Sequence, residues 1–165
     1  MKAENAQKIL STLKGVGIEL VVSLPDSWLV DLQILAKNDS AIRHVLVANE
    51  GDGVAICGGA WLGGKKSAML LENSGLLVAT YALARFHMTF GVPTLLLTSY
   101  RGDVGDGNWN LQTLGRVTEP MLKSLGLRYV IVRSADEIES AIIKAERTAS
   151  GTLLPTVVLL GLGNL

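Results

Sequence analysis

The sequence predicts an α/β fold, a doubly wound and mostly parallel six-stranded sheet with helices on both faces. Three observations lead to this prediction. Short apolar runs alternate with longer segments of helical periodicity along the chain. The apolar runs are nearly continuous, which is typical of parallel strands that are covered on both faces. Turn-forming residues, with 18 glycines in the chain, separate one segment from the next.

Length and composition narrow the class of protein. The 165 residues suit one domain, which we expect to cover 1–165, and the 48% of hydrophobic residues can fill a sizeable core. Fifteen basic and fifteen acidic residues cancel, so no basic field would attract nucleic acid or an anionic membrane. A lone cysteine excludes a disulfide framework. The polar first residues do not resemble a signal peptide, and we expect a cytoplasmic protein.

The first half of the chain contains three expected helices and three expected strands. Apolar positions at helical spacing stop at a glycine pair, and Asp26 or Ser27 is the expected cap of the second helix. The expected order is helix 3–14, strand 19–24, helix 28–36, strand 43–48, glycine-rich helix 53–64 and strand 68–71. The last two strands and the glycine-rich helix between them form a βαβ unit.

The second half repeats the alternation. Its expected elements are helix 76–90, strand 93–99, an irregular segment 100–110, a helical region 111–125, strand 129–133, helix 134–149 and strand 155–160. Helix 76–90 is apolar nearly all round, which indicates a buried helix. Pro120 is expected to begin a new helical segment. Ser134 and Glu137 have the spacing of a capping box, and Ser150-Gly151 is the expected stop of that helix.

Candidate chemistry gathers at the ends of two strands. Glu50 follows strand 43–48, and Glu72-Asn73-Ser74 follows strand 68–71, so both groups are expected on the rim where parallel α/β sheets bind ligands. A partly desolvated carboxylate at Glu50 would hold its proton more tightly. Arg101 offers a planar fork to an anionic group. Two histidines and one cysteine, widely separated, make no recognisable metal site.

Several motifs in their order along the chain resemble one family. They are Ser23-Leu24-Pro25-Asp26-Ser27, Asn49-Glu50-Gly51, Gly63-Gly64-Lys65-Lys66, Asn73-Ser74-Gly75-Leu76, Arg101-Gly102 and Gly115-Arg116-Val117-Thr118. Together they resemble the pyrimidine-binding (PYR) domain of thiamine diphosphate enzymes. Within that group they resemble the sulfopyruvate decarboxylase alpha subunit and the matching half of phosphonopyruvate decarboxylase.

The resemblance implies a reaction and a set of roles. Glu50 would hydrogen-bond N1′ of the aminopyrimidine of thiamine diphosphate, and a small anionic 2-oxo acid would lose carbon dioxide to give an aldehyde. The implied catalytic residues are Glu50 and Asp26. The implied cofactor-binding residues are Glu50, Asn73, Ser74 and Gly75, and the implied substrate-binding residues are Asp26, Ser27, Glu72 and Arg101, the last for a sulfonate or phosphonate tail.

The chain also departs from the family pattern. Glu72 stands where the family has glutamine, and Leu77-Val78 stands where it has Gly-Asn. The half that holds Mg²⁺ and the diphosphate is missing, and the two Gly-Asp-Gly triplets at 51–53 and 105–107 lack the asparagine that should follow. The resemblance therefore implies a diphosphate-binding (PP, beta) partner subunit that holds Mg²⁺. Segments 53–64 and 76–90 are the expected contact surfaces with that partner, and homodimers or higher oligomers of this chain are also expected.

Three alternatives remain open from the sequence. A non-catalytic PYR-like binding or regulatory module would keep the fold without the chemistry, and Glu72 is compatible with it. A thiamine diphosphate-dependent carboligase subunit would share the cofactor but not the outcome. A flavodoxin-like or Rossmann-like nucleotide binder is disfavoured because Ile56 occupies the third glycine position of the GxGxxG pattern.

Overall fold

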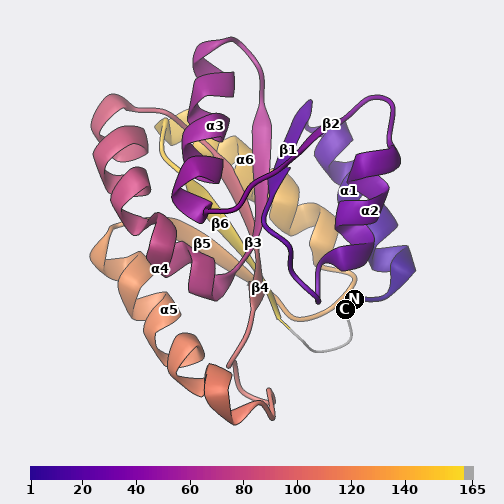
Figure 1. Ribbon diagram of the computed structural model, residues 1–165, viewed down its shortest axis with the longest axis vertical. Helices are drawn as coiled ribbons and strands as arrows, with labels where there is room; N and C mark the ends of the chain where they lie inside the picture. Colours follow the sequence, from indigo (N-terminus) through magenta and orange to yellow (C-terminus); the bar gives the residue numbers. More distant parts are fainter. Residues whose placement is uncertain (162–165) are drawn as a thin grey trace.

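The computed structural model describes residues 1–161 and shows strands alternating with helices along the chain (Figure 1). The elements are α1 (Ala3–Gly15), β1 (Leu20–Ser23), α2 (Val30–Asn38), β2 (Arg43–Leu46), α3 (Glu50–Leu62), β3 (Ser67–Glu72), α4 (Asn73–Ala82), the π-helix η1 (Leu83–Met88), β4 (Leu95–Tyr100), the 3₁₀-helix η2 (Trp109–Leu111), α5 (Gln112–Ser124), β5 (Arg128–Val132), α6 (Ile138–Thr152) and β6 (Thr156–Gly161).

The six strands form one sheet in the order β2-β1-β3-β4-β6-β5, and every pair is parallel. The predicted fold class is therefore confirmed. The sheet places β1 between β2 and β3, so the two strands of the expected βαβ unit are not direct neighbours. Strand order depends on contacts between distant segments, and the local pattern does not encode it.

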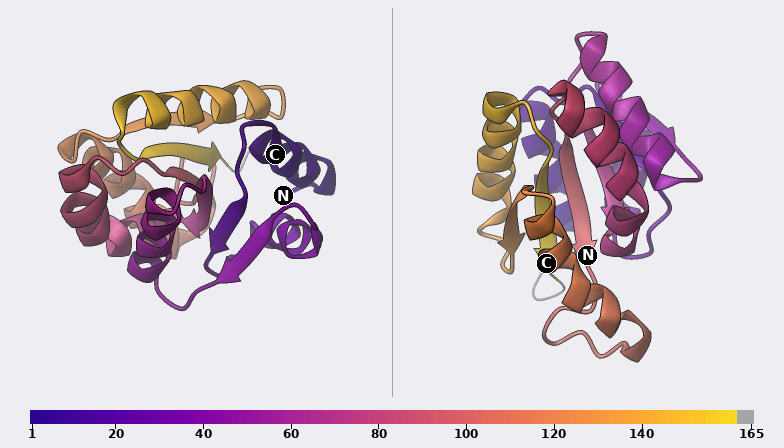
Figure 2. Two further views of the ribbon diagram at one scale, coloured as in Figure 1. Left: turned by 90° about the horizontal axis from the view of Figure 1, so that it is seen from above. Right: turned by 90° about the vertical axis from the view of Figure 1, so that its left-hand side faces the viewer.

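Helices cover both faces of the sheet and enclose two separate cores (Figure 2). Helices α1, α2 and α6 pack on one face, and α3, α4, η1 and α5 pack on the other. Successive strand residues point to opposite faces, so Leu70 joins the first core and Leu71 joins the second. The central strands β3, β4 and β6 are almost completely buried, as their continuous apolar sequences predict.

Two helices begin three residues earlier than the pattern predicts, and both starts lie at the rim. Helix α3 begins at Glu50 because Asn49 caps it, with its Oδ1 accepting hydrogen bonds from Gly51 N at 2.8 Å and Asp52 N at 3.4 Å. Helix α4 begins at Asn73, immediately after β3. The polar residues after β2 and β3, which the sequence suggested were loops, therefore form the first turns of α3 and α4.

The expected break at Pro120 is wrong, because α5 runs without interruption from Gln112 to Ser124. Pro120 lies on the exposed side of the helix. The carbonyl four residues earlier loses its helical partner there, but water can satisfy it on an exposed face.

The prediction of a buried helix over 76–90 is also wrong. Leu76, Ala79 and Leu83 are buried, but Tyr81 is 76% exposed and Phe90 is 68% exposed. The segment changes from α-helix to π-helix at Leu83. Its second apolar side therefore faces away from the core of this chain.

Helix α6 keeps half of the expected capping box. Glu137 Oε2 accepts hydrogen bonds from Arg133 N at 2.8 Å and Ser134 N at 3.2 Å, but Ser134 makes no return bond from its side chain. The helix begins at Ile138 and continues to Thr152, past the expected stop at Ser150-Gly151. Among residues 1–161, no helix has the length and apolar character that a membrane crossing requires.

Candidate active site

The candidate residues lie at the carboxyl-terminal edge of the sheet, beside the place where the winding direction reverses. From β1 the chain passes to β2 on one side and then returns to β3 on the other side of β1. Neighbouring strands whose connections diverge in this way leave a crevice between them, where doubly wound proteins bind ligands. Asp26 follows β1, Glu72 ends β3, and Arg101 follows β4.

Glu50 reaches this edge from the first turn of α3. Its side chain rests against Gly75 in α4, where a β-carbon would come within 2.6 Å of Glu50 Cγ and 2.7 Å of Glu50 Oε1. Any side chain at position 75 would therefore displace the carboxylate. Glu50 is half-buried, and its carboxylate has no hydrogen-bond partner among residues 1–161. The structure thus brings together Glu50 and Gly75, which the sequence had placed on two different strand ends.

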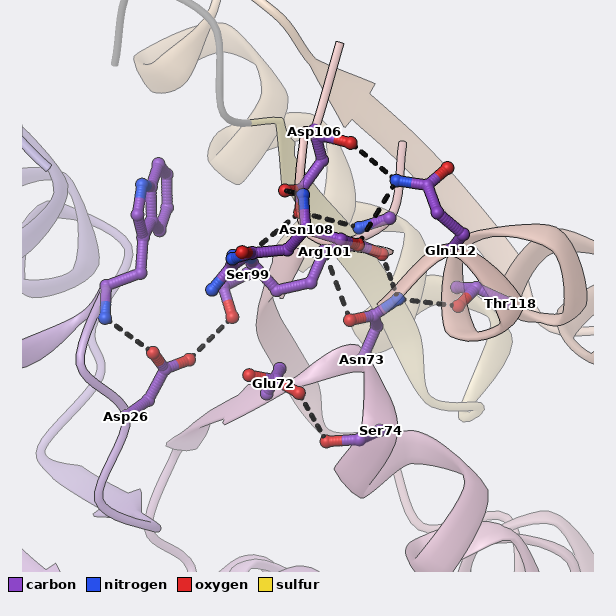
Figure 3. A network of polar contacts seen from close by, with 12 residues as sticks. Asp26, Glu72, Asn73, Ser74, Ser99, Arg101, Asp106, Asn108, Gln112 and Thr118 are labelled. Atoms are coloured by element: carbon purple, nitrogen blue, oxygen red, sulfur yellow. Dashed lines mark hydrogen bonds and ion pairs between the residues drawn. The ribbon is translucent and has the colours of Figure 1, made fainter. Parts of the chain in front are cut away.

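Asp26 is a buried carboxylate that joins β1 to β4 (Figure 3). Its Oδ1 accepts hydrogen bonds from Trp28 N at 2.7 Å and Leu29 N at 3.4 Å, in the turn that precedes α2. Its Oδ2 accepts a hydrogen bond from Ser99 Oγ at 2.5 Å. Both oxygens are engaged, so the orientation of Asp26 is fixed. Ser27 is exposed and makes no side-chain hydrogen bond within the described residues. The expected cap at Asp26 or Ser27 is wrong, because α2 has Leu29 at the cap position and no side-chain cap bond.

Glu72 lies beside Ser99 because the two are paired across β3 and β4 in the parallel register. Residues paired in this way project from the same face of a sheet, so Glu72 belongs to the side of the rim that Asp26 occupies. Glu72 Oε1 accepts a hydrogen bond from Ser74 Oγ at 2.7 Å. Two carboxylates therefore flank Ser99.

Asn73 is completely buried and clamps the start of the loop after β4 (Figure 3). Its Nδ2 donates to Arg101 O at 2.8 Å and to Thr118 Oγ1 at 2.9 Å, and its Oδ1 accepts from Arg101 N at 3.1 Å. The amide thus ties α4 to the Arg101 backbone and to α5. Each of its polar atoms has a partner, as buried polar groups require.

The Arg101 side chain is also held in place. Its Nε donates to Asp106 Oδ2 at 3.0 Å, and the two side chains are 13% and 4% exposed. Burial opposes the ionisation of Asp106, but hydrogen bonds from Gly102 N and Arg101 outweigh it, so its pKa lies below the ordinary value. Asp106 is therefore ionised at neutral pH.

Three residues of this network had not been singled out as site residues. Ser99 lies at the end of an apolar strand, Thr118 lies inside a helix, and Asp106 lies in a triplet that had been set aside as a chance match. The polar character of Ser99 at a strand end was a usable signal. Thr118 closes one of the motifs that carry the resemblance, but its bond to Asn73 could not be predicted, because the two residues are 45 positions apart.

The histidines and the cysteine lie outside the rim. His87 is buried with Nδ1 at 2.8 Å from Val92 O and Nε2 at 2.9 Å from Val54 O, and burial lowers its pKa. Burial raises the pKa of Cys57 to about 11. His44 Nε2 lies 2.7 Å from Ser23 Oγ. Among residues 1–161, no group of three His, Cys, Asp or Glu side chains is arranged to hold a metal ion.

Comparison with known proteins adds a family and a fold. No protein-family model matches the chain. The sulfopyruvate decarboxylase subunit alpha of Methanothermobacter thermautotrophicus is 30% identical over 142 residues, which cover 86% of each chain. The phosphonopyruvate decarboxylase of Streptomyces viridochromogenes is 29% identical over 160 residues, covering 96% of this chain but 40% of that protein.

A solved structure shows the same fold in a larger protein. The 2-oxoglutarate:ferredoxin oxidoreductase from Magnetococcus marinus superposes with a TM-score of 0.71 and 15% identity, over 98% of this chain and 29% of the other. The identity is low, so this likeness concerns the fold alone. The sequence similarity extends over nearly the whole length of the alpha subunits, and the chain belongs to the family of sulfopyruvate decarboxylase alpha subunits.

Proposed function

We propose that this chain is the PYR-type subunit of a heteromeric, thiamine diphosphate-dependent decarboxylase of a sulfonated or phosphonated 2-oxo acid. The observation that carries the proposal is Glu50, whose carboxylate has no partner among residues 1–161 and rests against Gly75. A half-buried carboxyl group without a partner among residues 1–161, placed in the room that the missing side chain of Gly75 leaves, fits an aminopyrimidine that offers N1′ to a carboxyl group. When bound, thiamine diphosphate supplies the electron sink for the departing carbon dioxide.

In this proposal each side chain has a limited task. Glu50 shares a proton with N1′ of the aminopyrimidine, and Gly75 leaves the room that this contact needs. Asn73 does not reach outward, because all its polar atoms bind within the chain, so it positions the Arg101 backbone. Ser74 and the α4 amino terminus border the cofactor.

Asp26 and Glu72 define the acidic part of the proposed substrate site. Asp26 is fixed by Ser99 and by its turn, so it presents a carboxyl group of defined orientation to the reacting carbon. Glu72 adds a second carboxylate on the same face, and like charges repel an anionic substrate. Arg101 offsets this repulsion and is the proposed receptor for the sulfonate or phosphonate tail. Ser27 lies at the exposed edge of the same loop.

A partner subunit completes the proposed site. The sulfopyruvate decarboxylase relative is named as subunit alpha, which implies a second subunit. The phosphonopyruvate decarboxylase relative is a longer protein, and this chain covers only 40% of it. Helices α3 and α4 carry several exposed apolar side chains, and apolar side chains gathered on a surface often mark a protein contact. The exposed side chains are Ile56, Leu62, Leu77, Val78 and Tyr81. We assign this surface to protein contact, and we assign Mg²⁺ and the diphosphate to the partner.

The test is reconstitution of the complex with the product of the adjacent reading frame, thiamine diphosphate and Mg²⁺. Carbon dioxide release from sulfopyruvate, phosphonopyruvate and pyruvate is expected only with both chains. Glu50→Gln should lower the rate by about 10²-fold to 10⁴-fold, the usual contribution of a positioned acid or base. Asp52→Asn, in the same helical turn, is the matched control and should leave the rate unchanged. Full activity with Glu50→Gln would favour the non-catalytic module, and cofactor binding without release would favour a carboligase.

A further inference from the structure

Arg101 is held at both its backbone and its side chain. Its backbone N and O both bind the Asn73 side chain, and its Nε binds Asp106. Asn73 is completely buried and the Asp106 side chain is 4% exposed, so neither partner can turn away from Arg101 towards water. An ordinary surface arginine is not held at both its backbone and its guanidinium. This degree of constraint indicates that the position of the Arg101 side chain matters.

Asp106 is the centre of the loop that carries Arg101. Its Oδ2 accepts from Gly102 N at 2.8 Å as well as from Arg101 Nε, and its Oδ1 accepts from Asn108 N at 3.0 Å. Its carbonyl oxygen accepts from Gln112 Nε2. One carboxylate therefore orders the loop and the arginine at once (Figure 3).

The same loop is fixed to α5 by two glycines. Gly102 has a φ of +74°, a left-handed conformation that favours glycine. A β-carbon at Gly115 would collide with the Gly102 backbone, and one at Gly102 would collide with Leu111 O. Backbone contact this close leaves the loop no room to shift. The backbone that carries Asp106 is therefore held firmly against α5.

The way Asp106 binds leaves part of the guanidinium available. Its contact is made through Nε, and among residues 1–161 the two terminal nitrogens of Arg101 have no hydrogen-bond partner. These two nitrogens form a planar pair of donors that suits a tetrahedral oxyanion. If Asp106 instead paired with both terminal nitrogens, that donor pair would be occupied.

We infer that Asp106 is a positioning residue for substrate selection. It holds Arg101 through Nε so that the two terminal nitrogens receive the sulfonate or phosphonate of the substrate. The inference rests on the proposed function for the identity of the anion. Asp106 itself touches no substrate, and it acts through Arg101.

Asp103 provides a matched control within the same loop. It is also a largely buried aspartate, 10% exposed, but it pairs with Arg133 after β5 instead of Arg101. Its Oδ1 accepts from Arg133 Nη2 at 3.3 Å. Asp103→Asn thus removes one carboxylate charge and one ion pair from the loop without removing the partner of Arg101.

The first experiment measures steady-state kinetics of the complete complex. Asp106→Asn should raise KM for sulfopyruvate and phosphonopyruvate about tenfold to 100-fold, the loss expected for charge-assisted hydrogen bonds, with kcat changed less than about threefold. KM for pyruvate, which has no anionic tail, should not change, and Asp103→Asn should match the parent. In an Arg101→Lys background, Asp106→Asn should add no further rise. An equal rise for pyruvate, or an additive one in that background, would overturn the inference.

A second experiment does not depend on catalysis. Methanesulfonate carries the tail anion alone, and its titration into the ¹⁵N-labelled full chain can be followed at the Arg101 side-chain resonance. The parent and Asp103→Asn should show saturable shifts, and Asp106→Asn should bind at least about tenfold more weakly. Equal titration of all three would overturn the inference. If the Asp106→Asn complex releases carbon dioxide with an unchanged KM, the positioning role of Asp106 is refuted and the proposed function stands. If the chain binds methanesulfonate in a way that depends on Asp106 but the complex releases no carbon dioxide, the proposed function is refuted and the positioning role stands.

Discussion

Arg101 and Glu50 stand on the same edge of the sheet, yet the chain holds them in opposite ways. Arg101 is fixed by Asn73 and Asp106, in a region where the carboxylates of Asp26 and Asp106 and the amide of Asn73 all have hydrogen-bond partners. The Glu50 carboxylate makes no hydrogen bond within residues 1–161, and beside it the helices α3 and α4 expose apolar side chains. We call the first region, containing Asp26, Asn73, Ser99, Arg101 and Asp106, the closed side. The second, containing Glu50 and the exposed faces of α3 and α4, is the open side.

The difference shows which part of the site one chain can complete. A closed network of hydrogen bonds is stable without help, because its buried polar groups are satisfied. Within residues 1–161 the open side has a carboxylate without a partner and an apolar surface without a cover, and we expect a partner subunit and the cofactor to satisfy both. The proposed substrate site is therefore preorganised within one chain, whereas the proposed contact with the cofactor is completed only when the subunits assemble.

Glycine to alanine substitutions should separate the two sides most strongly. Gly115→Ala forces a β-carbon into the Gly102 backbone on the closed side and should destabilise the chain by about 3 kcal/mol. Gly59→Ala on the open side meets no atom within 4 Å. It should stabilise the lone chain by ~0.5–1 kcal/mol, the helix propensity gain. Urea unfolding of both variants measures the contrast, and two shifts of the same sign would refute it.

Exposed side chains of the open side should matter for assembly and not for folding. Tyr81 is 76% exposed on α4, and Ile34 is 53% exposed on α2, on the opposite face of the sheet. Replacing either by serine should change the unfolding free energy of the lone chain by less than about 0.5 kcal/mol. Tyr81→Ser should weaken the complex by about 2 kcal/mol, near 30-fold in Kd, as for a buried interface aromatic. Calorimetric titration of the partner checks this, and a larger loss with Ile34→Ser would place the interface on the other face.

The fold was predictable because its signals are local. Continuous apolar runs such as Leu95–Leu97 and the stripe through Ile9 and Leu13 specify strand or helix within a few residues. Helix starts were less predictable. Asn49 caps α3 from outside the helix, and the glycines that follow it suggested a turn where the structure has a first turn of helix.

The candidate site was predictable in membership but not in its connections. Strand ends placed Glu50 and Glu72 on one rim, because parallel strands end at the same edge, and the structure brings Asp26 and Arg101, which the resemblance implied, to that edge as well. The bond between Asp26 and Ser99 joins residues 73 positions apart and exists because β1 and β4 flank β3. Sequence periodicity carries no strand order, so such bonds, and with them the closed side, come only from the structure.

Acid should weaken the closed side, because protonation of Asp106 removes the charge that holds Arg101. This loss of stability is the smallest effect that we expect. The pKa of Asp106 is lowered from 3.8 by its hydrogen bonds from Gly102 and Arg101, against the opposing effect of burial. A carboxyl group with a lowered folded-state pKa contributes stability above its unfolded pKa and loses it as the pH falls through the folded value. The parent chain should therefore exceed Asp106→Asn in stability by a constant amount from about pH 7 to about pH 5.

Below about pH 4 that difference should shrink, because the parent carboxylate takes up its proton and comes to resemble the amide. Urea unfolding of the parent and Asp106→Asn at a series of pH values measures this stability difference. Asp52→Asn is the control, because it removes a carboxylate that makes no bond to Arg101. A difference that persists unchanged to about pH 2.5 would mean that the ionised form of Asp106 is not what holds the loop. Arg101 would then be held by shape alone, and the closed side would owe its order to the contact between Gly102 and Gly115.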